Sequence, residues 1–140
     1  MSDTQSQVEE YIVVAEDSAP NRNILVHLLK RIGYKVLDFE DGQLAWEGIQ
    51  KHSDKNIVAL ISDIMMPQMS GIELLRNVRG HEKIKDLPVV LITAVTEKEY
   101  IAQAKELKVN GYILKPVTAE RIRTKFKELF PNKVFAKFAG

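Results

Sequence analysis

The chain has 140 residues, of which 45% are hydrophobic, and this length and composition are typical of one globular domain with a substantial core. Its 20 basic and 19 acidic residues give a formal net charge of +1, so the charge balance gives no argument for binding to nucleic acid or to a membrane surface. Cysteine is absent, which excludes disulfides and thiolate chemistry, and no apolar run approaches the ~20 residues that a membrane-spanning helix needs.

Short apolar runs alternate with longer segments of helical period along the chain, as in a series of strand–helix units. The run at 57–62 is almost wholly apolar, which is typical of a strand that is covered on both faces. The predicted strands are 11–15, 35–39, 57–62, 88–93 and 111–114. The predicted helices are about 20–32, from the turn at 41–42 to about 50, 71–79, 97–107 and 118–130.

Local signals mark where these elements begin and end. Pro20 suits the first turn of a helix, and Gly33 suits the left-handed residue that follows one. The pair Asp41-Gly42 predicts a turn. We therefore predict one α/β domain at 10–130, with a flexible tail at 1–9 and an extension at 131–140.

Acidic and basic side chains follow the predicted strands at the points where the strands end. Right-handed crossovers place these ends at one edge of a parallel sheet, where ligands bind. Clustered carboxylates repel one another, so such a group is usually neutralised by a cation or a lysine, and hard oxygens suit Mg²⁺. The residues concerned are Glu16 and Asp17 after the first strand, Asp63 after the third, Thr93 at the end of the fourth and Lys115 after the fifth. This set predicts an aspartyl nucleophile for a phosphoryl group, with a metal and a lysine offsetting its charge.

In these motifs the chain resembles the receiver domain of two-component response regulators, such as the chemotaxis response regulators. The resemblance covers about Tyr11 to Phe130. It implies a flavodoxin-like fold, a (βα)5 doubly wound parallel sheet of five strands in the order 2-1-3-4-5. The motifs are Glu16-Asp17, the segment from Asp63 to Gly71 (Asp-Ile-Met-Met-Pro-Gln-Met-Ser-Gly), Thr93-Ala94, and Tyr112-Ile113-Leu114-Lys115-Pro116.

The resemblance also implies the role of each site residue. Asp63 is then the phosphoacceptor, and the protein catalyses only its own phosphorylation and dephosphorylation, so it is not an enzyme acting on other substrates. Thr93 and Lys115 contact the phosphoryl group, and the Lys115–Pro116 peptide is expected to be cis. The implied Mg²⁺ ligands are Asp17, Asp63 and the backbone carbonyl of Met65, with Glu16 acting through a water.

A conformational switch follows from the same resemblance. Phosphorylation draws Thr93 toward the site, and Tyr112 turns into the space that it leaves. This movement reshapes the surface of the fourth helix, the fifth strand and the fifth helix, where the family binds its partners. The phosphoryl donor is expected to be a histidine kinase or a histidine phosphotransfer protein, and the output a downstream protein target, with a phosphorylation-linked dimer as one form of it.

Two departures from the family pattern affect these expectations. Many relatives have Gly-Ala where this chain has Lys108-Val109, so the exit of the fourth helix is expected to differ. Two residues beyond Asp63 and Thr93 stand the apolar residues Met65 and Val95, which predict slow hydrolysis of the phosphoryl group.

Other classes fit the sequence less well. A haloacid-dehalogenase-type phosphatase places a second acid two residues after its nucleophile, where this chain has Met65. A nucleotide-binding Rossmann domain needs a Gly-rich loop where Glu16-Asp17 stands. A pseudo-receiver acting as a constitutive interaction module, and a receiver cut from a hybrid histidine kinase, are the remaining alternatives.

The expected setting is a stand-alone cytoplasmic signalling protein. The polar first ten residues are not a signal peptide, and neither direct nucleic-acid binding nor membrane attachment is predicted. Residues 131–140 carry Phe135 at helical spacing from other apolar residues, so this segment is expected to dock on its own domain or to bind a partner.

Overall fold

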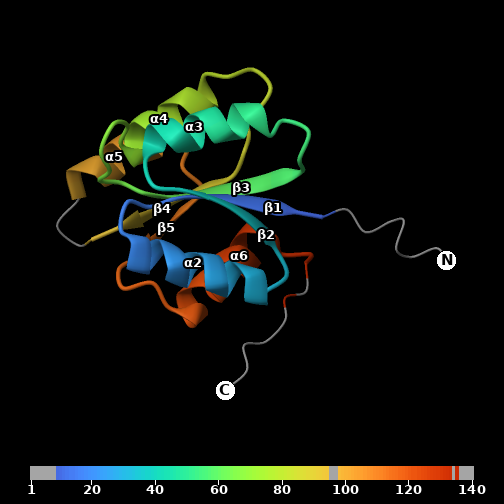
Figure 1. The fold of residues 1–140 in the computed structure, drawn as a ribbon. Helices are drawn as coiled ribbons and strands as arrows, with labels where there is room; N and C mark the ends of the chain where they lie inside the picture. Colours follow the sequence, from blue (N-terminus) through green and yellow to red (C-terminus); the bar gives the residue numbers. More distant parts are fainter. Residues whose placement is uncertain (1–8, 95–97, 134, 136–140) are drawn as a thin grey trace.

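The computed structural model describes residues 9–94, 98–133 and 135. Five strands and five helices alternate in this part of the chain, and their labels follow Figure 1, in which the helices begin at α2. The elements are β1 (Tyr11–Ala15), α2 (Ala19–Arg31), β2 (Lys35–Phe39), α3 (Gly42–Lys51), β3 (Ile57–Asp63), α4 (Gly71–Arg79), β4 (Val89–Thr93), α5 (Lys98–Glu106), β5 (Gly111–Leu114) and α6 (Ala119–Leu129).

The strands form one parallel sheet in the order β2-β1-β3-β4-β5, which confirms the predicted doubly wound, flavodoxin-like fold. Helices α2 and α6 cover one face of the sheet, and α3, α4 and α5 cover the other (Figure 1). The strand order reverses between β1 and β3. In sheets of this kind a crevice opens at that point, outside the carboxyl ends of the strands.

Side chains of the central strands alternate between two apolar clusters, one on each face of the sheet. Ile61 of β3 packs with Leu25 of α2 and Phe126 of α6, whereas Leu60 packs with Ile49 of α3. Successive side chains of a strand point to opposite faces, so a strand between two helical layers is apolar throughout. This explains the continuous apolar run in the sequence.

Several helix ends confirm the local signals. Ser18 caps α2, with Pro20 in its first turn, and Gly33 follows the helix at a φ of 108°. The turn predicted at Asp41-Gly42 needs correction, because these residues begin a helix. Asp41 is the N-cap of α3, its Oδ1 accepts the Leu44 N–H at 2.8 Å, and Gly42 is the first helical residue.

The start and the end of the described chain meet beside α2. Phe135 is buried against the rings of Tyr34 and Phe126, with centroid separations of 6.1 Å and 6.2 Å. Lys133 forms an ion pair with Glu10 and lies 4.5 Å from the centroid of the Tyr34 ring. This part of the extension therefore docks on its own domain, while 1–8, 134 and 136–140 lie outside the described residues. Among the described helices, none combines the length and the hydropathy needed to cross a bilayer.

Candidate functional site

The structure brings the predicted site residues together at one edge of the sheet. Glu16 and Asp17 follow β1, Asp63 ends β3, Thr93 ends β4, and Lys115 follows β5. Two backbone bonds continue the sheet to this edge: the Glu16 N–H donates to Phe39 O at 3.1 Å, and the Lys115 N–H donates to Thr93 O at 3.0 Å. The strand ends thus converge at the switch point between β1 and β3.

Three carboxylates and one ammonium group form the centre of this site. Glu16 and Asp63 are each only 2% exposed, whereas Asp17 lies at the surface. One oxygen from each of these three residues lies within 4.8 Å of the other two. Lys115 Nζ donates to Asp63 Oδ2 at 3.1 Å, so one acidic charge is balanced directly.

The other oxygen of Asp63 carries the most information. Asp63 Oδ1 is buried and has no hydrogen-bond partner in the described part of the chain. A buried carboxylate oxygen without a donor is costly, and such an atom in a native site usually has a ligand to bind. Its lone pairs are therefore available to a cation or to a phosphorus atom.

The donor set fits a hard divalent cation such as Mg²⁺, which favours carboxylate and carbonyl oxygens. Asp17 and Asp63 supply carboxylates, with Glu16 close enough to act through a water. Met65 lies in the loop after Asp63. A hard cation favours its backbone carbonyl oxygen over its soft thioether sulfur, so only the carbonyl is a candidate ligand. A bound cation would supply positive charge that neutralises the carboxylates and the oxygens of a phosphoryl group.

The pKa of Glu16 reflects both its burial and the negative charge of the acidic cluster. Burial raises the pKa of Glu16 to about 7, and the negative charge of Asp63 adds to this effect, while the hydrogen bond from Ser18 N–H opposes it. Near neutral pH and without a cation, this carboxyl group therefore holds a proton part of the time. A ligand that needs the ionised form competes with that proton.

The backbone around Asp63 is tightly packed. A Cβ placed on Gly71 would lie 2.3 Å from Asp63 O, so the start of α4 needs glycine to approach this closely. The Ser62 hydroxyl donates to the same Asp63 carbonyl at 2.8 Å. The Gly71 N–H donates to Ile64 O at 2.8 Å and closes the loop that carries Met65.

Thr93 and Tyr112 lie on the neighbouring strands β4 and β5. Thr93 is fully buried, and its hydroxyl donates to Ala94 O at 3.0 Å. The Tyr112 hydroxyl reaches toward α5, where it donates to Ile101 O at 3.5 Å, and burial raises its pKa. Val95 lies outside the described residues, so the expectation about phosphoryl hydrolysis stays a prediction.

Two features of the site were missed from the sequence. Arg22 Nη1 donates to the Glu16 carbonyl at 2.8 Å, and its Nε lies 3.4 Å from Asp38 Oδ2, so this side chain of α2 holds the loop after β1. The position of Arg22 one turn after the Ser18 cap was the available signal, but an arginine at such a position is usually a solvated surface charge.

The second missed feature is a pocket of about 380 Å³ beside Lys115, which is lined by Glu16, Asn21, Ile24, Ile92, Lys115, Pro116 and Val117. The Lys115–Pro116 peptide at its wall is cis, as predicted.

Comparisons with known proteins agree with this geometry. Residues 12–127 match the family described as the response regulator receiver domain. The chain is 37% identical over 119 residues to chemotaxis protein CheY-3 of Vibrio cholerae, which covers 85% of this chain and 90% of that protein. It is 35% identical over 117 residues to chemotaxis protein CheY1 of Helicobacter pylori, covering 83% and 93% respectively. The solved structure of Vibrio cholerae CheY4 superposes with a TM-score of 0.79 at 27% identity, covering 88% of this chain and 100% of that one. The chain therefore belongs to the response regulator receiver family and is similar to its chemotaxis-type members.

Proposed function

We propose that this protein is a phosphorylation-controlled signalling module in which Asp63 accepts a phosphoryl group in a Mg²⁺-dependent reaction. The observation that carries the proposal is the state of the Asp63 carboxylate. Its Oδ2 is paired with Lys115 at 3.1 Å, whereas its buried Oδ1 has no partner within the described chain. One of the two oxygens lies within 4.8 Å of an oxygen of Glu16 and of Asp17. A structural carboxylate would have both oxygens satisfied.

The reaction supported by these residues is a displacement at phosphorus. An oxygen of Asp63 forms a bond to the phosphorus atom of an acyl phosphate or a phosphohistidine. The bond from phosphorus to the leaving oxygen or nitrogen breaks, and its electron pair stays with the leaving acetate or imidazole. Lys115 is placed to balance charge on the transferring group, and the Thr93 hydroxyl can turn from Ala94 O to donate to a phosphoryl oxygen.

The same group movement accounts for switching. When Thr93 is drawn toward the phosphoryl group, space opens beside it on β4, and the Tyr112 ring on the adjacent strand can turn inward. The bond from the Tyr112 hydroxyl to Ile101 O is long at 3.5 Å, so little free energy opposes its loss. The result would be a shift in population of the surface formed by α5, β5 and α6, which we call the α5–β5–α6 face.

The proposed partners follow from this chemistry. A histidine kinase or a histidine phosphotransfer protein supplies the phosphoryl group, and a downstream protein or a second copy of the chain reads the α5–β5–α6 face. The relatives named as chemotaxis proteins support a signalling role of this kind, and we propose that it operates in the cytoplasm.

Phosphorylation with a small donor tests the proposal. The protein is incubated with acetyl phosphate and Mg²⁺ and analysed by intact mass, with Asp63→Asn as the matched control. We expect the mass of one phosphoryl group on the unmodified protein and none on the variant, and no gain when Mg²⁺ is chelated. An unmodified protein that gains no phosphoryl mass would instead act as a constitutive interaction module.

A further inference from the structure

The start of α3 touches the loop that follows the phosphoacceptor. A Cβ placed on Gly42, the first residue of α3, would lie 2.1 Å from Met69 O, 2.8 Å from Met69 C and 2.9 Å from Met69 Cβ. Atoms in proteins do not approach this closely, so the backbones of Gly42 and Met69 are in direct contact. Any side chain at position 42 would therefore displace one of the two segments.

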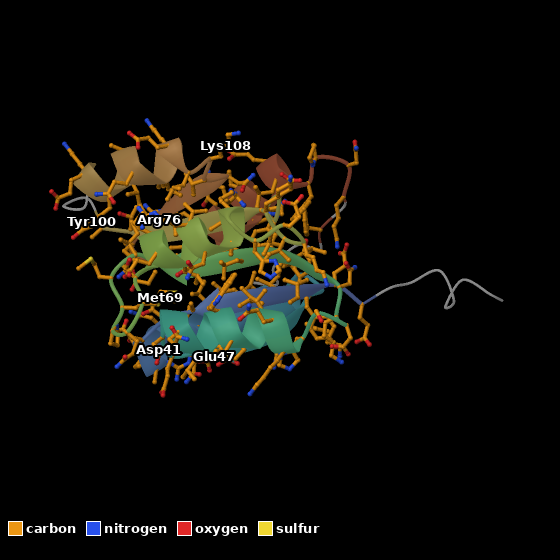
Figure 2. The ribbon with its side chains drawn as sticks, turned by 90° about the horizontal axis from the view of Figure 1, so that it is seen from above. Asp41, Glu47, Met69, Arg76, Tyr100 and Lys108 are labelled. Atoms are coloured by element: carbon orange, nitrogen blue, oxygen red, sulfur yellow. The ribbon has the colours of Figure 1, made fainter. Side chains whose placement is uncertain are left out.

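The α3 side of this contact is fixed by a helix cap. Asp41 Oδ1 accepts the Leu44 N–H at 2.8 Å, and the Asp41 carbonyl accepts the Ala45 N–H at 3.1 Å. These bonds hold the first turn of α3 in place. Figure 2 shows Asp41 at the start of the helix and Met69 on the neighbouring loop, at the same end of the molecule.

The loop side of the contact is also held in one shape. Met69 N–H donates to Pro67 O at 2.7 Å, Gln68 takes a left-handed φ of 69°, and Gly71 N–H donates to Ile64 O at 2.8 Å. Loop 64–71 is thus closed by its own bonds and joins directly to Asp63. A force on Met69 is transmitted along this loop, because it has little freedom to absorb the displacement locally.

We infer that Gly42 is a positioning residue, whose contact with Met69 holds loop 64–71, and with it Asp63 and the Met65 carbonyl, in the arrangement that binds the metal. The inference rests on the proposed function, since it concerns the same Mg²⁺ site. Residues that orient the ligands of a metal affect its affinity without touching it. Gly42 would act in this way from another helix.

Calorimetric titration with Mg²⁺ tests the inference with Gly42→Ala. We expect Mg²⁺ binding to weaken by about 10-fold or more, the size typical of changes that displace ligands indirectly. The rate of acetyl phosphate labelling should fall at low Mg²⁺ and recover substantially at saturating Mg²⁺, because the nucleophile itself is intact. Circular dichroism without Mg²⁺ must first show that the variant is fully folded, because a partly unfolded population raises the apparent Mg²⁺ midpoint by linkage alone.

The matched control is Ile49→Ala in the same helix. Ile49 is buried and lies about two turns, or ~10 Å, beyond Gly42, so its truncation destabilises α3 without adding an atom against Met69. We expect the folded Ile49→Ala protein to bind Mg²⁺ like the unmodified protein. Equal weakening in both variants, or unchanged affinity in Gly42→Ala, would overturn the inference.

A second pair of variants covers the case in which Gly42→Ala does not fold. Asp41→Ala removes the cap of α3, whereas Asp41→Asn removes the same charge and keeps a capping oxygen. We expect weaker Mg²⁺ binding in Asp41→Ala than in Asp41→Asn, and equal affinities would contradict the inference. If the unmodified protein bound no Mg²⁺ and gained no phosphoryl mass, the proposed function would fail, and the inference would fail with it.

Discussion

Replacing Lys108 with glycine should stabilise this protein, although the substitution removes a whole side chain. Lys108 follows α5 at a φ of 60°, in the left-handed region. The Val109 N–H donates to Ala104 O and the Lys108 N–H to Lys105 O, both at 3.0 Å. This pair of bonds defines a Schellman motif, whose left-handed residue is usually glycine.

Helix α2 provides the matched comparison, because it ends in the same motif with glycine in place. The Tyr34 N–H donates to Leu29 O and the Gly33 N–H to Lys30 O, both at 3.1 Å, and Gly33 has a φ of 108°. A Cβ at Gly33 would meet nothing within 4 Å. Gly33→Ala therefore measures the backbone cost of the left-handed conformation without a steric clash.

The expected magnitude follows from two opposing terms. A left-handed conformation costs a residue with a Cβ about 1–2 kcal/mol. Glycine also increases the conformational entropy of the unfolded chain, which offsets roughly 0.5–1 kcal/mol of the gain from relieving this strain. Lys108→Gly should therefore raise the free energy of unfolding by about 0.5–1 kcal/mol, and Gly33→Ala should lower it by a similar amount. The hydrogen bond from Arg79 Nη2 to Lys108 O is made to the backbone, so the substitution keeps it.

Urea unfolding monitored by circular dichroism measures both changes, with the slope of the transition held common to all variants. Lys127→Gly in α6 is the control for a lysine in helical conformation, and it should lose about 0.5–1 kcal/mol. If the Lys108→Gly variant were no more stable than the unmodified protein, or were less stable as the Lys127→Gly variant is, the strain assigned to the left-handed conformation of Lys108 would be refuted.

Three further predictions concern the extension and the acidic cluster. Phe135→Ala should lower the free energy of unfolding by about 3 kcal/mol, because the ring is 6% exposed, and Phe135→Leu by much less, as urea unfolding would show. When a chelator removes divalent cations, folding raises the pKa of Glu16 from 4.5 to about 7. The contribution of Glu16 to the free energy of unfolding is therefore at its maximum below pH 4.5 and is lost as the pH rises past about 7. Glu16→Gln should abolish this loss of stability in urea unfolding curves measured across that pH range. Arg22→Lys keeps the charge but loses the two-sided contact with the Glu16 carbonyl and Asp38, and calorimetry should show Mg²⁺ binding about 10-fold weaker, whereas unchanged binding would argue against that contact.

The fold and the central site could be predicted because their signals are local. Strands between two helical layers must be apolar throughout, and helices facing a sheet repeat their apolar residues at a helical period. The site residues could be predicted because Asp63, Lys115 and their partners occur where strands end, and parallel topology brings those ends together.

The contacts that hold the site could not be predicted, because they depend on segments distant in sequence. In the sequence Asp41-Gly42 resembles a turn. Only the structure shows that a Cβ on Gly42 would lie 2.1 Å from Met69 O. His81, which follows α4, packs edge-on against Trp46 of α3, with ring centroids 5.8 Å apart, and neither residue signals this contact in the sequence. In each case the residue type is common, and only the neighbour supplied by the fold gives it a role.

The departure at Lys108-Val109 shows how such a neighbour can replace a missing signal. Arg79, at the end of α4, donates through Nε to Leu107 O at 3.0 Å and through Nη2 to Lys108 O at 2.9 Å. Its Nη2 also donates to Asn110 Oδ1 at 2.8 Å, which in turn accepts the Val89 N–H at 2.8 Å. These bonds hold Lys108 in a left-handed conformation against its local preference, and the expected difference from the family at this helix exit stays a prediction.

These hydrogen bonds of Arg79 and Asn110 also limit how the α5–β5–α6 face can move in the proposed switch. The segment that follows α5 is bonded to Arg79 of α4 and, through Asn110, to the start of β4. Both elements contribute buried side chains to the apolar cluster on this face of the sheet. The hydrogen bond between the Tyr112 hydroxyl and Ile101 O lies nearer the start of α5. At 3.5 Å it is longer, and therefore weaker, than the hydrogen bonds at the other end of the helix. A change that begins at Thr93 should therefore move the first turns of α5 while its last turn stays in place. The helix would then turn about the end that Arg79 holds.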